Sequence, residues 1–274
     1  MNERTLNREI SFNGVGLHSG KAVSMRFIPA KPGSGIVFVR TDLVGRSIVK
    51  ADIASVTSTA RGTGLGDIVN TVEHVLSALN AFSVTNLEIE LNAPEVPAFD
   101  GGASAICESI RSAGPIDQKV PLRALSLSEP VVVWDGDACA AALPHDRFAV
   151  GFMINYPVPF IGAQYYSLDV APASFEREIA PARTYGFTSE LDELKQKGLA
   201  LGAGTDNAVA IGPTGYLNGL RFHNELVRHK ILDMIGDLSL LRCEMKARIL
   251  GIRSGHALNV ALAKKLAAHI KEAG

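Results

Sequence analysis

The first half of the chain alternates short apolar runs with turn residues, a pattern that is typical of β-strands joined by tight connections. The stretch 13–20 is rich in glycine and predicts a turn directly after the first run. Runs of the same character return after residue 121. Strands are predicted over residues 8–12, 23–28, 36–39, 86–91, 125–133 and 148–154.

Other segments have the composition of helices, and two of them show a clear 3.6-residue apolar period. In one, Val72, Val75 and Leu79 share a face; in another, Ile231 and Ile235 do so. Helices are predicted over residues 71–82, 103–113, 190–197, 222–241 and 257–272.

Strands and helices are mixed without strict alternation, which indicates an α+β fold with helices packed on largely antiparallel sheets. The chain has 274 residues, and about 150 residues per domain suggests two domains. The best linker is 114–121, because it has prolines near both ends and a polar middle. We therefore expect an N-terminal α+β domain over 1–120 and a C-terminal α+β domain over 121–274.

The charge and cysteine content limit the classes of function. Formal net charge is −1 and no polybasic run appears, so nucleic acid is not an expected partner. The N-terminus does not resemble a signal peptide, and no stretch approaches the roughly 18 apolar residues of a spanning helix. Three widely spaced cysteines without a Cys-x-x-Cys pair suggest buried thiols in a reducing cytoplasm.

The helix over 222–241 carries a row of polar residues opposite its apolar face. His229, Asp233 and Asp237 stand at i, i+4 and i+8. A helix brings i and i+4 side chains within about 6 Å of each other, which suits two ligands of one metal ion. The same spacing also fits a solvated polar stripe with an incidental His–Asp pair.

The helix over 71–82 offers a second set of polar groups. His74 projects nearly opposite the core face, and Glu73 stands about 100° around the axis. This geometry does not suit a packed core histidine, and it places a carboxylate beside a candidate ligand. Thr71 is a candidate cap for the helix, so a structural role for the segment also remains open.

Together, His74, His229 and Asp233 supply two imidazoles and one carboxylate. Catalytic zinc takes three protein ligands and leaves a position for water, whose pKa the metal lowers to about 7. Glu73 could serve as general base, and His256, at a glycine turn that opens the last helix, as general acid. A solvent-exposed histidine at a helix start is the alternative for His256. The residues alone therefore lead to a candidate metal hydrolase.

With these residues included, the sequence resembles a known family, the UDP-3-O-acyl-N-acetylglucosamine deacetylases, which are zinc enzymes of lipid A biosynthesis. Six motifs occur in the family's order, and the similarity extends from Thr5 to about Asn259. Six ordered motifs are far more specific than any one of them. They lie at residues 13–20, 70–74, 92–101, 182–187, 228–238 and 254–259.

The resemblance implies metal ligands at His74, His229 and Asp233, holding Zn²⁺ or alternatively Fe²⁺. It implies that Glu73 is the general base and His256 the general acid. The family fold has two domains, each a sheet layered on a pair of helices, with the active site between them.

Further roles are carried over from the same motifs. Asp237 matches the partner that orients the protonated histidine, and Thr184 matches the residue that hydrogen-bonds the developing oxyanion. Lys230 matches a lysine near the nucleotide diphosphate. Tyr185 stands where the family has a phenylalanine beside the glucosamine ring, and Gly62 stands where a cysteine is common.

The substrate implied is an acylated UDP-sugar, with the acyl chain in a passage formed by about 190–211. At most a transient contact with a membrane surface is expected, and the protein is expected to be a monomer. Two other classes of protein remain as alternatives: a non-catalytic nucleotide-sugar or lipid-binding protein, and a non-haem iron oxygenase with a two-His, one-carboxylate triad. Further substrate contacts are expected at Phe187, Leu199, Gly202 and His18.

Overall fold

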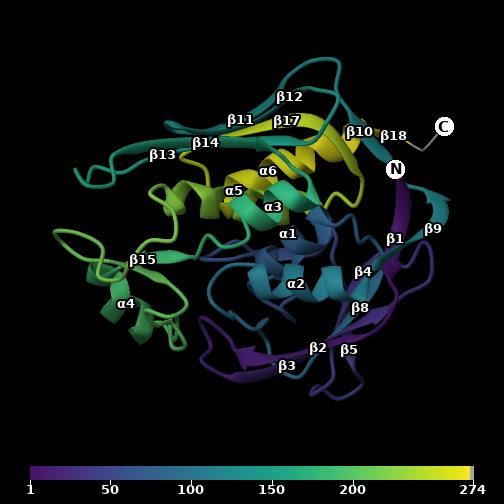
Figure 1. The fold of residues 1–274 in the computed structure, drawn as a ribbon, viewed down its shortest axis with the longest axis horizontal. Coiled ribbons are helices and arrows are strands. Elements are labelled where there is room, and N and C mark those ends of the chain that lie inside the picture. Colours follow the sequence, from purple (N-terminus) through teal and green to yellow (C-terminus); the bar gives the residue numbers. More distant parts are fainter. Residues whose placement is uncertain (272–274) are drawn as a thin grey trace.

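The computed structural model describes residues 1–271, and it has an α+β fold, as expected. Figure 1 shows two sheets on the outside of the molecule with the main helices between them. The order of the layers is therefore sheet, helices, helices, sheet. None of the helices within residues 1–271 has the length and apolarity needed to cross a bilayer.

The N-terminal layer is a five-stranded sheet with the order β2-β3-β8-β4-β5. Neighbouring strands are antiparallel except β4 and β8, which are parallel. Residues of β3 alternate between buried and exposed positions, so one face of the sheet contributes to the core. The strands are β2 (Ile10–Val15), β3 (Ala22–Pro29), β4 (Ile36–Arg40), β5 (Ser47–Lys50) and β8 (Leu87–Leu91); the helices are α1 (Glu73–Ala81) and α2 (Ser104–Ala113).

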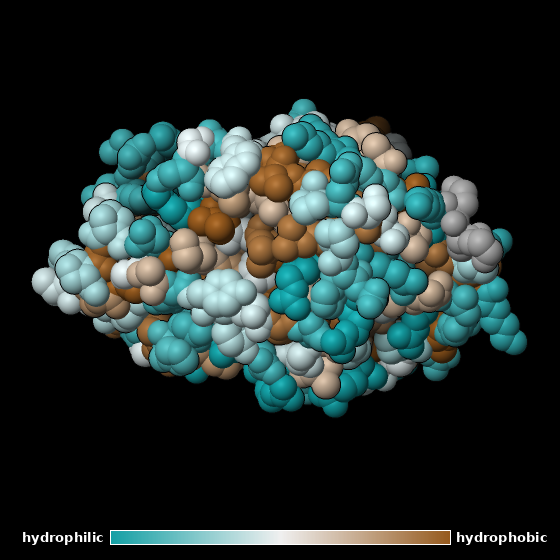
Figure 2. All heavy atoms as spheres, turned by 90° about the horizontal axis from the view of Figure 1, so that it is seen from above, coloured by the Kyte–Doolittle hydropathy of each residue, from teal (hydrophilic) through white to brown (hydrophobic). Residues whose placement is uncertain are grey.

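The C-terminal layer is a seven-stranded sheet built around β17, which pairs with β10, β12 and β13. Figure 2 looks down on this side of the molecule and shows apolar side chains gathered near the middle of the face. The strands are β10 (Ala124–Ser126), β11 (Val131–Asp135), β12 (Ala138–Pro144), β13 (Ala149–Asn155), β14 (Ala163–Asp169), β17 (Glu244–Ile252) and β18 (Ile270–Lys271). Its helices are α3 (Pro172–Glu178), α5 (Glu225–Ser239) and α6 (His256–Leu266).

Shorter elements connect and flank these layers. The segment with β15, α4 and β16 extends beyond the end of the layers in Figure 1. The remaining strands are β1 (Asn2–Leu6), β6 (Val56–Ser58), β7 (Gly64–Leu65), β9 (Pro115–Pro121), β15 (Tyr185–Phe187) and β16 (Val209–Ile211). The remaining helices are α4 (Leu191–Gln196) and three 3₁₀ turns, η1 (Ile53–Ser55), η2 (Thr188–Glu190) and η3 (Ala267–His269).

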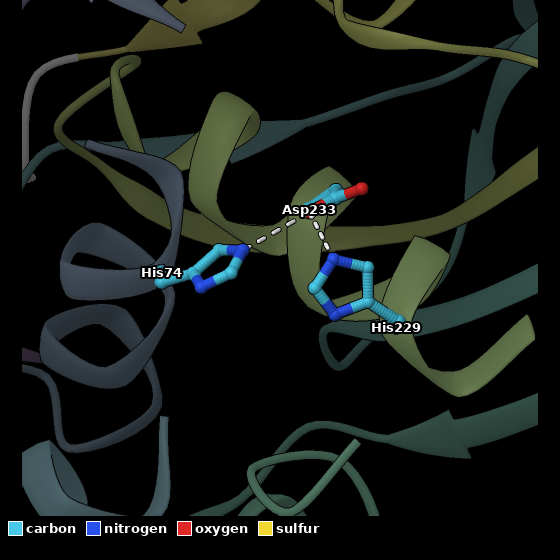
Figure 3. A group of neighbouring side chains, drawn as sticks. All are labelled: His74, His229 and Asp233. Carbon is cyan, nitrogen blue, oxygen red and sulfur yellow. Dashed lines mark ion pairs between the residues drawn. The ribbon is translucent and has the colours of Figure 1, made fainter. Parts of the chain in front are cut away.

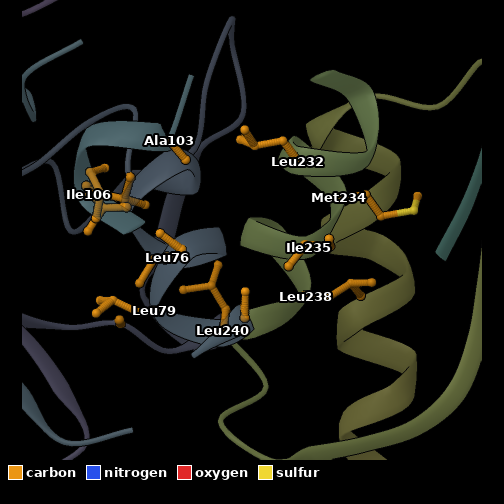
Figure 4. Close-up of a cluster of buried hydrophobic side chains, with 14 of the residues drawn as sticks. Leu76, Leu79, Ala103, Ile106, Leu232, Met234, Ile235, Leu238 and Leu240 are labelled. Carbon is orange, nitrogen blue, oxygen red and sulfur yellow. The ribbon is translucent and has the colours of Figure 1, made fainter. Parts of the chain in front are cut away.

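The contact between α1 and α5 joins the two layers. Leu76 and Leu79 of α1 and Leu232 and Ile235 of α5 belong to one buried cluster, which Figure 4 shows between the helices. Gly236 permits the close approach, because a methyl group there would overlap the backbone carbonyl oxygen of Glu73. Dense packing of this kind holds the start of α1 against the C-terminal half of α5 in one geometry.

Several expectations need correction. The predicted linker is the strand β9, which pairs with β1, because prolines are tolerated at strand ends as well as in loops. The last helix ends at Leu266 and not at 272, since Ile270 pairs with Leu125 of β10; residue 272 itself lies outside the described residues. The strand expected over 125–133 is divided between β10 and β11.

Two structural alternatives that the sequence left open are excluded. Thr71 does not cap α1: Val72 holds the cap position, and the Thr71 hydroxyl donates to Glu95 Oε1 at 3.1 Å. The polar row of α5 is not solvated, because every residue of that helix except Lys230 and Ser239 is buried. Its polar side faces α1 of the other layer.

Candidate active site

The two helices that join the layers bring the three expected metal ligands together. Asp233 Oδ1 lies 3.3 Å from His229 Nε2 and 3.7 Å from His74 Nε2. Figure 3 shows His74 reaching across from α1 toward the pair on α5. One ligand atom from each residue lies within 4.8 Å of the other two. Two imidazole nitrogens and a carboxylate oxygen at this spacing fit a single divalent ion such as Zn²⁺.

The backbone orients the ring of His229. Its Nδ1–H donates to the carbonyl oxygen of Ala182 at 3.1 Å, which leaves the Nε2 lone pair facing Asp233 and His74. Burial lowers the pKa of His229 to about 4, so the ring is neutral at pH 7. A neutral imidazole with a fixed tautomer is the form that binds a metal.

Asp233 is ionised and shared between the imidazoles and a lysine. Its Oδ2 accepts a hydrogen bond from Lys230 Nζ at 2.6 Å. Burial would raise the pKa of Asp233, but interactions with the His229 ring and with the charged Lys230 hold it well below its usual range. In turn, although burial would lower the pKa of Lys230, Asp233 raises it. The lysine therefore stays charged beside the ligand set.

In the absence of an ion, His74 is protonated more readily than His229. Burial opposes a charge on the ring, but Asp233 and Glu73 raise the pKa of His74. A divalent cation would replace this proton, so we expect ion binding to release protons and to weaken as pH falls.

Glu73 lies at the start of α1 with its carboxylate buried beside the ligand set. Its Oε2 accepts a hydrogen bond from the backbone N–H of Thr63 at 2.9 Å. Burial raises the pKa of Glu73, because a charged carboxylate loses its hydration there. A carboxylate with a raised pKa accepts a proton more readily at neutral pH.

His256 opens α6 and faces Glu73 across the pocket, with its Nε2 4.0 Å from Glu73 Oε1. On its other side, His256 Nδ1–H donates to Asp237 Oδ2 at 2.9 Å. Burial would lower the pKa of His256, but the charge and hydrogen bond of Asp237 raise it to about 9. The ring is therefore a protonated acid at neutral pH, and Glu73 and His256 form a carboxylate–imidazolium pair.

These groups line a hollow of about 380 Å³. Thr184, Tyr185 and Lys230 also line it, as does Tyr156, whose hydroxyl lies 2.8 Å from that of Tyr185. A larger hollow of about 770 Å³ lies at the far ends of α1 and α5. Both clusters that could hold a metal ion among residues 1–271 belong to the smaller hollow, so we place the chemistry there.

Four expected substrate contacts and Asp237 lie outside the residues that line this hollow. Asp237 is completely buried behind His256. Phe187 packs edge-on against Tyr156, with ring centroids 5.5 Å apart. Leu199 lies after α4 in the extended segment.

His18 and Gly202 tie that segment to the N-terminal layer. His18 Nε2–H donates to the carbonyl of Arg61 at 3.0 Å, and His18 Nδ1 accepts from the N–H of Ala200 at 3.3 Å. The N–H of Gly202 donates to the carbonyl of Leu17 at 3.0 Å. A Cβ at Gly202 would meet the backbone of the same turn, so glycine is needed for this close approach.

Sequence reasoning missed two polar residues around Glu73 and His256. Thr63 bonds to both Glu73 and Asp237, and the side-chain amide of Asn259 donates to Asp237 Oδ2 at 2.9 Å. Asn259 lies in a recognised motif, but nothing in the local pattern around Thr63 predicts its partners. Gly62 beside it leaves space next to the Glu73 carboxylate, because a Cβ there would lie 3.1 Å from Glu73 Oε1.

Comparison with known proteins agrees with the geometry. The model of the family UDP-3-O-acyl N-acetylglycosamine deacetylase matches residues 3–268. The protein named UDP-3-O-acyl-N-acetylglucosamine deacetylase from Myxococcus xanthus is 43% identical over 270 residues, which cover 97% of this chain and 86% of that protein. The protein of the same name from Trichormus variabilis is 41% identical over 277 residues, which cover 98% and 99% of the two chains. The chain therefore belongs to the UDP-3-O-acyl N-acetylglycosamine deacetylase family.

Proposed function

We propose that the chain hydrolyses the acetamide of a UDP-3-O-(3-hydroxyacyl)-N-acetylglucosamine and releases acetate, the committed step of lipid A biosynthesis. The observation that carries the proposal is the position of the Glu73–His256 pair beside His74, His229 and Asp233. A protein that only bound the nucleotide sugar would not require an aligned base and acid. The names of the relatives support the substrate class.

We propose Zn²⁺ as the ion, held by His74, His229 and Asp233; the same ligands also accept Fe²⁺. When bound, such an ion polarises a carbonyl oxygen and lowers the pKa of a water molecule.

The residues of the chain then divide the proton transfers. Glu73 takes a proton from the attacking water while the water oxygen forms a bond to the acetamide carbon. The Thr184 hydroxyl donates a hydrogen bond to the carbonyl oxygen as negative charge develops on it. When the C–N bond breaks, His256 Nε2–H protonates the departing amine, and acetate leaves. The charge of Asp237 holds His256 in the protonated form that this step needs.

The remaining roles concern the substrate. We propose that Lys230 contacts the diphosphate, exchanging its bond to Asp233 for a bond to phosphate. Tyr185 and Phe187 contact the sugar side of the substrate. The acyl passage is formed by the segment 190–211, which includes Leu199 and Gly202, and His18 supports this segment. The sugar-facing role of Tyr185 is supported by its place in the hollow.

We further propose a domain boundary near residue 120, a monomer and a cytoplasmic location. The boundary is supported by the sheets, because the strands of the five-stranded sheet precede residue 121 and those of the seven-stranded sheet follow it.

The test is release of acetate from the acylated UDP-sugar by metal-loaded protein. Glu73→Ala and His256→Ala should each lower kcat by at least about 100-fold, because general acid–base catalysis contributes about 10²–10⁴-fold. Matched controls are Glu108→Ala and His223→Ala, which remove exposed groups outside the hollow and should leave kcat unchanged. Full turnover by either site variant would end the assignment.

A further inference from the structure

Thr63 touches both halves of the acid–base machinery. It lies in the short connection between β6 and β7, and it is completely buried. Its backbone N–H donates to Glu73 Oε2 at 2.9 Å, and its hydroxyl donates to Asp237 Oδ1 at 2.5 Å. One residue of the N-terminal layer thus holds the general base of its own layer and the carboxylate of the other layer that orients the acid.

The hydrogen bonds around Asp237 show why the hydroxyl matters. His256 Nδ1–H and the Asn259 amide both donate to Oδ2, at 2.9 Å each. The bond that holds Oδ1 comes from Thr63. Without this donor, one oxygen of a buried carboxylate loses its partner, which is costly and leaves the carboxylate free to rotate.

The direction of the Thr63 hydroxyl is also set. His256 Nδ1 lies 3.4 Å from Thr63 Oγ1, but its proton points to Asp237 at the shorter distance of 2.9 Å. The hydroxyl carries a single proton, and Asp237 accepts it. The chain of contacts therefore runs from Glu73 through Thr63 and Asp237 to His256.

We propose that Thr63 is a positioning residue that couples the general base to the general acid across the contact between the two layers. Glu73, Asp237 and His256 come from three different helices, α1, α5 and α6. Thr63 fixes Glu73 and Asp237 relative to each other, and through Asp237 it fixes the 4.0 Å separation of Glu73 Oε1 and His256 Nε2. This inference rests on the proposed deacetylase function.

The competing explanation is that Thr63 only anchors its loop. An anchor would affect the stability of the protein but not its turnover once folded. A positioning residue instead affects kcat more than KM, because it acts on groups that transfer protons in the transition state. A serine at position 63 should also restore the activity, because it keeps both the backbone N–H and the hydroxyl as donors.

The experiment compares Thr63→Val, Thr63→Ser and the wild type, all metal-loaded. Valine keeps the shape and the backbone N–H but removes the hydroxyl. We expect Thr63→Val to lower kcat by about 10- to 100-fold with KM within about threefold, since misplacement by about 1 Å costs up to about 100-fold. Thr63→Ser should stay within about threefold of the wild type. The matched control is Thr5→Val, at a buried threonine whose hydroxyl accepts from the N–H of Ala30.

A second readout does not depend on turnover or metal. The His256 Nδ1–H proton, hydrogen-bonded to Asp237, should give a downfield proton NMR signal in metal-free protein, assigned by its loss in His256→Ala. The signal should persist in Thr63→Ser and shift or broaden in Thr63→Val. If Thr63→Val does not fold, Thr63→Ala removes the same hydroxyl and takes its place.

Two results would overturn the inference: folded Thr63→Val with wild-type kcat and an unchanged signal, or Thr63→Ser as impaired as Thr63→Val. Failure of the deacetylase proposal looks different. In that case the wild type and Thr5→Val would release no acetate, while the NMR comparison would still report on the coupling.

Discussion

The groups expected to do the chemistry and those expected to recognise the substrate occupy very different surroundings. The ligand set, Glu73 and Asp237 are buried between two packed helices, and hydrogen bonds hold the side chains of His229, Glu73 and Asp237. Most of the predicted substrate contacts lie on the three-residue strand β15 and in the segment around α4, where most residues are half-buried or exposed. The exceptions are Lys230 on α5 and His18 after β2. In Figure 1 that segment stands outside the layers.

The two regions meet different physical requirements: the chemistry requires rigidly placed groups, and substrate recognition requires adaptable ones. Proton transfer needs groups placed within about 0.5 Å, and packed helices provide that placement. A sugar nucleotide with an attached chain is more easily accommodated by loops, which tolerate sequence change. Substitutions between the helices should therefore alter kcat or metal binding, and substitutions in the extended segment should mainly alter KM.

The largest effect is expected from His229→Ala. Loss of one of three ligands, and of the ring oriented by Ala182, should lower zinc affinity by more than about 100-fold, since even outer partners of ligands contribute about 10- to 100-fold. Competition with a chelator measures this directly. His223→Ala is the matched control. Unchanged zinc affinity in His229→Ala would show that the metal does not bind at this position.

Asp237→Asn should produce the next largest effect, together with a shift in pH dependence. The wild-type acid has a pKa of about 9, so kcat should fall as pH rises through about 9. Without the charge of Asp237, the pKa of His256 should fall, because burial still opposes the charged ring and only Glu73 and Asp233 remain to raise it, so the falling limb should move to lower pH. A pH profile of kcat with the same alkaline limb in both proteins would contradict the assigned role.

A smaller effect, on stability, is expected from Gly236→Ala. The added methyl group would collide with the backbone of Glu73 and push α1 from α5. Overpacking of this kind costs about 1–3 kcal/mol in the free energy of unfolding, which denaturant titration measures. Gly215→Ala is the control, because a Cβ there has no neighbour within 4 Å. Equal stability of the two variants would mean that α1 and α5 do not approach each other closely at Gly236.

The smallest effect should come from Tyr185→Phe in the substrate-facing region. The change keeps the ring and removes only the hydroxyl that bonds to Tyr156. We expect KM for the acylated UDP-sugar to change by about two- to fivefold, with kcat nearly constant, because one neutral hydrogen bond contributes about 1 kcal/mol. Steady-state kinetics measures both constants. A large loss of kcat would show that the substrate-facing region also contributes to the chemical step.

Local sequence pattern determined much of the architecture. The apolar period of residues 71–82 and 222–241 predicts helices that the structure contains as α1 and α5, and the i, i+4 spacing of His229 and Asp233 predicts neighbouring side chains. It failed where pairing between distant segments decides the outcome, as for β9 with β1 and for Ile270 with Leu125.

The sequence by itself therefore predicted the helices α1, α2, α4, α5 and α6 but not α3, the polar sides of α1 and α5, and the residue types available for metal and proton chemistry. Only the tertiary structure decided that the polar side of α5 faces α1 instead of water, that His74 meets Asp233, and that Thr63 links Glu73 to Asp237. The physical reason is that periodicity reports positions around one helix axis. Which surface covers that side depends on how the layers pack, and here a glycine at 236 permits the approach.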